Sequence, residues 1–61
     1  MTTKHIIISR TSDEELIRRW MLLQAEQEGL DWEVLDSYEQ FLEAGDVPFD
    51  AAISALYEWD I

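Results

Sequence analysis

Residues 11–29 read TSDEELIRRWMLLQAEQEG, and this stretch predicts the first of three helices. Ser12 with Glu15 fits a capping box, in which the hydroxyl and the carboxylate each bind a backbone N–H that the first turn leaves unpaired. Gly29 marks the end, because glycine adopts the left-handed conformation of a helix C-terminus at little cost. The expected helix spans 12–28, and its apolar face consists of Leu16, Ile17, Trp20 and Leu23, with Met21 at the edge.

A second amphipathic stretch follows over 31–44. We expect Asp31 to cap this helix, and Leu30 to pack on Leu35 as a hydrophobic staple. Gly45 closes it for the same reason that Gly29 closes the first. The expected apolar stripe consists of Val34, Leu35, Tyr38, Phe41 and Leu42.

A third helix is expected over 47–59, where Pro48 is tolerated in the first turn because its missing N–H would be unpaired anyway. Its inward face consists of Phe49, Ala52, Ile53 and Leu56. A chain of about 60 residues has room for one modest core, so we expect a single domain over 1–61. The pattern predicts a mainly α fold, a small three-helix bundle made of a helical hairpin plus a third helix.

The segment before the first helix has a different character. Residues 4–10, Lys-His-Ile-Ile-Ile-Ser-Arg, contain three successive isoleucines, whose β-branched side chains favour an extended strand. A strand without a second strand in the same chain leaves its backbone hydrogen-bonding groups without partners. Three possibilities stay open for Ile6, Ile7 and Ile8: pairing in a homodimer, addition to a sheet edge of another protein, or extended packing across the helices.

Charge is distributed unevenly along the chain. The sequence has 14 acidic and 4 basic residues, a net charge of −10. The four basic residues all lie in the first third, and eleven acids follow from Trp20 onward without a Lys or Arg. Neutralising phosphates requires clustered Lys and Arg, so direct binding to nucleic acid is excluded and a basic protein partner is expected.

The residues needed for several kinds of chemistry are missing. The chain has no cysteine and a single histidine, His5, so the sequence offers no nucleophile and base pair for covalent catalysis. We therefore expect no enzyme activity and no catalytic residues. The carboxylates do not follow the spacing of a calcium-binding loop, so no metal site and no cofactor are expected. No signal pattern and no apolar run of membrane-spanning length occurs, which predicts a cytoplasmic protein without membrane contact.

One short motif has a known counterpart. Asp36-Ser37 is similar to the Asp-Ser-Leu attachment site of acyl carrier proteins, which are also acidic and helical. The similarity covers two residues, and Tyr38 stands at the third position. The resemblance implies Ser37 as the residue that would be modified.

The acidic residues around the second helix form the candidate binding surface. Carboxylates three or four residues apart on a helix repel one another, and a helix that needed only solubility could mix signs. Trp20 is expected in the core, whereas tryptophan and tyrosine near helix edges are candidate anchors. The expected partner-binding residues are Glu26, Glu28, Asp31, Trp32, Glu33, Asp36, Glu39, Glu43, Asp46, Asp50, Tyr57 and Trp59.

These features favour a non-enzymatic protein–protein interaction module. The expected role is a small acidic inhibitor that occludes a basic, nucleic-acid-binding surface, and a nucleic-acid-processing enzyme or complex is a candidate partner. In its general style the chain resembles DNA mimics and phage-encoded anti-defence proteins. The alternative is a homodimeric assembly or regulatory domain that uses the N-terminal strand for dimerisation or β-augmentation. An antitoxin-like or kinase-regulating helical hairpin would share the same features.

Overall fold

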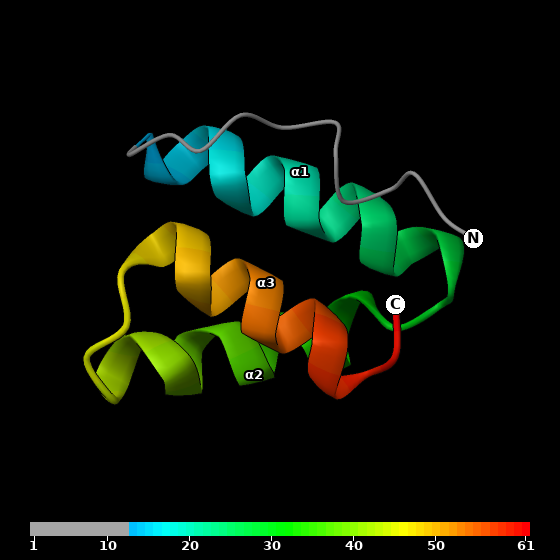
Figure 1. Cartoon of the computed structure of the whole chain (residues 1–61). Helices are drawn as coiled ribbons and strands as arrows, with labels where there is room; N and C mark the ends of the chain where they lie inside the picture. The colour runs from blue at the N-terminus through cyan, green and yellow to red at the C-terminus, as the bar shows by residue number, and fades with distance from the viewer. Residues whose placement is uncertain (1–12) are drawn as a thin grey trace.

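Three helices packed against one another form the whole of the described structure. The computed structural model describes residues 13–61. Its elements are α1 (Glu14–Gln27), α2 (Asp31–Glu43) and α3 (Pro48–Glu58), and each helix contacts both of the others (Figure 1). The predicted mainly α three-helix bundle is confirmed, and residues 13–61 contain no strand. The predicted strand over 4–10, with Ile6, Ile7 and Ile8, lies outside the described residues and stays a prediction.

Each helix begins close to its expected position, although two caps differ from the prediction. The N-cap of α1 is Asp13 rather than Ser12, and its side chain accepts a hydrogen bond of 3.2 Å from the backbone N–H of Leu16. In α2 the N-cap position is Leu30, which makes no side-chain cap, and Asp31 is the first helical residue. Pro48 is the first residue of α3, as its missing N–H predicts.

All three helices end in the same way, with a residue of positive φ just beyond the cap. Gly29 (φ 72°), Gly45 (φ 109°) and Asp60 (φ 60°) occupy this position. At each helix end, the backbone N–H of this residue and that of the next residue both donate hydrogen bonds to carbonyls of the last turn. These two hydrogen bonds define a Schellman motif. The N–H to carbonyl hydrogen bonds have N···O distances between 2.9 and 3.1 Å. From donor to acceptor, they are Leu30 to Ala25 and Gly29 to Glu26 in α1, Asp46 to Phe41 and Gly45 to Leu42 in α2, and Ile61 to Leu56 and Asp60 to Tyr57 in α3.

The core lies where the three helices meet. Four of the buried residues are alanines, whose short side chains allow the helices to approach closely, and larger side chains fill the remaining space. Ile61 is buried as well, since the Schellman turn of α3 brings it back against the core. The buried apolar residues are Ile17, Trp20, Met21, Ala25, Val34, Tyr38, Ala51, Ala52, Ala55, Leu56 and Ile61.

The buried face of α1 differs from the predicted one. Trp20 is buried as expected, but Leu16 and Leu23 are 46% and 54% exposed, whereas Met21 is fully buried. At about 100° per residue, Leu16 and Leu23 lie roughly 110° and 130° around the helix from the centre of the buried arc. That arc faces both α2 and α3, so it extends toward Met21 and Ala25 instead.

Candidate partner-binding surface

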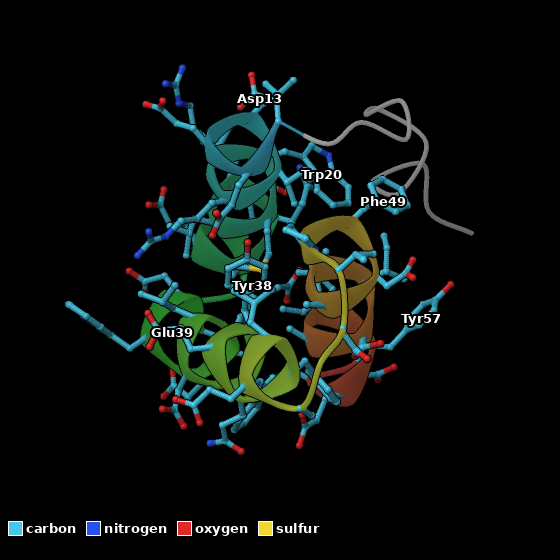
Figure 2. The ribbon with its side chains drawn as sticks, turned by 90° about the vertical axis from the view of Figure 1, so that its left-hand side faces the viewer. Asp13, Trp20, Tyr38, Glu39, Phe49 and Tyr57 are labelled. Atoms are coloured by element: carbon cyan, nitrogen blue, oxygen red, sulfur yellow. The ribbon has the colours of Figure 1, made fainter. Side chains whose placement is uncertain are left out.

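The side of α2 that points away from the bundle carries a row of acidic residues with one tryptophan among them. We call this surface the α2 outer face, and it consists of Trp32, Glu33, Asp36, Glu39 and Glu43, all exposed. Val34 and Tyr38 are buried on the opposite side of the same helix. In Figure 2 Glu39 extends outward from α2, and Tyr38 points into the middle of the bundle.

Helical spacing brings most of the α2 outer face into one stripe. Trp32, Asp36, Glu39 and Glu43 follow one another at intervals of four, three and four residues, so they lie on adjacent turns of one side. The stripe is about 17 Å long, at 1.5 Å per residue. Trp32 is 76% exposed, the largest exposed fraction among the large apolar side chains of residues 13–61. The surface therefore combines carboxylates with an accessible indole.

Few cations lie near these carboxylates. Between described residues, the ion pairs are Arg18 with Glu39 at 3.9 Å and Arg19 with Glu15 at 3.3 Å. Both join side chains that are about half exposed or more, and such pairs contribute about 0–1 kcal/mol. On α2 itself, the Gln40 amide donates a hydrogen bond of 2.9 Å to Asp36. The arginines of α1 thus neutralise one member of the α2 outer face and leave the rest of its charge in place.

Acidic residues at the C-terminal ends of the helices also lower the stability of the free protein. No basic residue lies in the last turn of α1, α2 or α3, and Glu26, Glu43 and Glu58 lie there instead. The C-terminal end of a helix carries a partial negative charge, so a carboxylate near it is unfavourable by about 0.3–1 kcal/mol. Glu43 is the last residue of α2 and is therefore doubly unfavourable, because it also lies four residues from Glu39.

The other predicted partner-binding residues are not all part of this surface. Glu26 and Glu28 are exposed at the end of α1, Asp31 is half-buried at the start of α2, and Asp46 is exposed before α3. Asp50 and Tyr57 are exposed on α3, and Figure 2 shows Tyr57 on the opposite side of the molecule from Glu39. The predicted set is thus divided over two sides of the bundle. The α2 outer face is where its members are most concentrated.

Trp59 has a structural contact that its sequence position does not reveal. It is 37% exposed, and its indole N–H donates a hydrogen bond of 2.9 Å to the Ser37 hydroxyl of α2. This bond joins the end of α3 to α2. Ser37 is only 7% exposed, so its hydroxyl is not presented to a modifying enzyme as the attachment serine of a carrier protein must be.

Tyr38 forms a second contact between helices that the sequence did not predict. Its ring is 1% exposed, and its hydroxyl donates a hydrogen bond of 3.4 Å to Glu14 of α1. Burial raises the pKa of Tyr38, and the adjacent Glu14 carboxylate raises it further, while Arg18 acts in the opposite direction. The contact holds α1 against α2 beside the Arg18–Glu39 pair.

Within 13–61, no three His, Cys, Asp or Glu side chains are placed to hold a metal ion together. None of the helices in this range is both long and apolar enough to span a membrane. His5 lies outside the described residues. Comparisons with protein-family models, curated proteins and solved structures found no match.

Proposed function

We propose that the protein is a non-enzymatic inhibitor that binds a basic protein surface through the α2 outer face and so blocks nucleic acid from that surface. The exposed carboxylates of α2, with no Lys or Arg on the helix, support this proposal most strongly. They repel one another in the free protein by a few tenths of a kcal/mol per pair. A cationic partner replaces that repulsion with attraction.

The spacing of the carboxylates fits a site built for phosphates. Successive acids of the stripe advance about 5 Å along α2, a step of the same order as the roughly 3.4 Å axial advance per nucleotide of a DNA strand. Side-chain flexibility accommodates the difference, because Glu and Asp carboxylates lie at the end of rotatable bonds. The α2 outer face can therefore present a line of negative charge to a groove lined by Lys and Arg.

Trp32 gives this surface a property that charge alone lacks. Interfaces obtain most of their binding energy from a few residues, and tryptophan is enriched among them. The indole of Trp32 is 76% exposed and lies four residues from Asp36 on the same side of α2. We propose that it fills an apolar recess between the cations of the partner, which fixes the register of the carboxylates.

Charge reversal on α2 tests the proposal. The variant Asp36→Lys with Glu43→Lys should lose capture of its partner from native-host lysate, measured by quantitative mass spectrometry of the bound fraction. The matched control, Glu15→Lys with Glu58→Lys, changes net charge equally at exposed positions outside the α2 outer face and should retain capture.

A salt titration and a competition assay complete the test. Affinity of the wild type for the captured partner should fall steeply as salt increases, because charge attraction between exposed groups is screened. The nucleic acid that the partner binds should displace the protein. Binding that is insensitive to salt, or equal loss in the control variant, would refute the proposal.

A further inference from the structure

The two exposed leucines of α1 form a surface separate from the α2 outer face. Leu16 is 46% and Leu23 is 54% exposed, and the two lie seven residues apart on one side of the helix. Trp20 lies between them in the sequence, close to the same side. The opposite side of α1 faces α2, where Glu14 contacts Tyr38 and Arg18 contacts Glu39. Leu16 and Leu23 are therefore open to an occupant that leaves the α2 outer face free.

We propose that residues 4–10 of the same chain are this occupant, and that Ile6, Ile7 and Ile8 pack across Leu16 and Leu23. The connection favours it, because the segment ends three positions before Asp13, the N-cap of α1, whose side chain is hydrogen-bonded to the backbone of Leu16. Ile8 lies five positions before Asp13, so the two residues are at most about 17 Å apart. Leu23, the more distant leucine, lies ten residues after Asp13, about 15 Å along the helix axis, which is within that reach.

Charge complementarity favours the same occupant. Lys4 and Arg10 flank the isoleucines, and the segment contains no acid. The remainder of the chain from Asp13 onward has 14 acids and only Arg18 and Arg19 as basic residues. A basic, apolar segment tethered to this acidic body is attracted to it, and its isoleucines match the exposed leucines of α1.

A second copy of the chain fits the surface less well. Each chain carries a net charge of −10, so two copies repel each other. Two partly exposed leucines also supply far less area than the roughly 800 Å² per partner of a stable interface. A tethered segment needs less area, because its effective concentration near α1 is high without any association between molecules.

Nuclear Overhauser contacts between methyl groups test this directly in the full-length protein. We expect cross-peaks from Ile6, Ile7 and Ile8 to Leu16 and Leu23 that are independent of protein concentration. A mixture of isotope-labelled and unlabelled chains separates contacts within a chain from contacts between chains. Absence of these cross-peaks, or their appearance only between differently labelled chains, would overturn the proposal, and the second outcome would identify a homodimer.

A double-mutant cycle measures the energetic coupling between the isoleucines and the exposed leucines. Changing Ile6, Ile7 and Ile8 together to Ser should lower the folded-to-unfolded ratio, and Leu23→Gln should lower it in the wild type but not in the serine variant. The expected coupling is about two- to tenfold in the unfolding equilibrium constant. Trp32→Gln is the control, because it changes an exposed ring on α2 and should combine additively with the serine substitutions. Additive behaviour of Leu23→Gln as well would overturn the proposal.

Discussion

Replacing Glu43 with lysine should make the isolated protein more stable, although the side chain is exposed and makes no described ion pair. The substitution removes repulsion from Glu39 four residues earlier and creates a Glu-to-Lys pair in the favourable order, each worth about 0.2–0.5 kcal/mol. It also replaces an unfavourable charge at the C-terminal end of α2 with a favourable one, each part being about 0.3–1 kcal/mol. Because the site is exposed and Arg18 already contacts Glu39, we expect the unfolding free energy to rise by about 1 kcal/mol, near the smallest sum of these contributions.

Urea unfolding followed by circular dichroism measures this gain. It corresponds to an increase in Tm of about 4–8 °C for a domain of this size. Glu43→Gln should give about half of the gain, since it removes the negative charge without adding a positive one. Both effects should shrink near 1 M salt, where the Debye length is about 3 Å. A Glu43→Lys variant that is no more stable than the wild type, or a gain unaffected by salt, would refute the view that these carboxylates repel one another.

Substitutions at two further positions test a contact of the core and the conformation of the last turn. The pKa of Tyr38 is raised by burial and by Glu14. The stability that the neutral Tyr38 hydroxyl contributes is therefore fully present below the unfolded pKa of about 10 and is lost as pH rises through the folded pKa. Tyr38→Phe should therefore reduce the loss of unfolding free energy as pH rises above about 10, as measured by urea unfolding. Asp60→Gly should raise the unfolding free energy by at most about 1 kcal/mol, because Asp60 has φ 60°, where glycine is unstrained and aspartate is less strained than most L-residues. Asp60→Asn removes only the charge, so equal stability of the two variants would show that the gain comes from loss of the carboxylate and not from the glycine backbone.

The sequence predicts the helices well because their ends are marked by chemistry that acts locally. Gly29 and Gly45 adopt the positive φ that ends α1 and α2. The corresponding end of α3 was less visible, since Asp60 takes that conformation without being a glycine. The sequence does not decide the N-cap of α1, because Ser12 and Asp13 are both good N-cap residues, and the structure has Asp13 there.

Packing among three helices was harder to predict than the helices themselves. Leu16 and Leu23 fit an apolar stripe of helical period, and so does Met21, and periodicity does not show where the two neighbouring helices lie. The structure buries Met21 and leaves both leucines partly exposed. The Trp59–Ser37 bond was equally inaccessible, because it joins residues 22 positions apart whose proximity depends on the tertiary fold.

The α2 outer face could be predicted because the period that buries Val34 and Tyr38 also places the intervening carboxylates on the opposite side. This arrangement affects binding and stability in opposite directions. In the free protein, like charges on α2 and at the helix ends lower the unfolding free energy. When cations of a partner approach, they attract these carboxylates and offset the repulsion among them. Association would therefore relieve a destabilisation that is present in the free protein. Variants that stabilise the free fold by changing charge on the α2 outer face, such as Glu43→Lys, should therefore weaken binding, whereas Asp60→Gly lies outside that surface and should leave binding nearly unchanged.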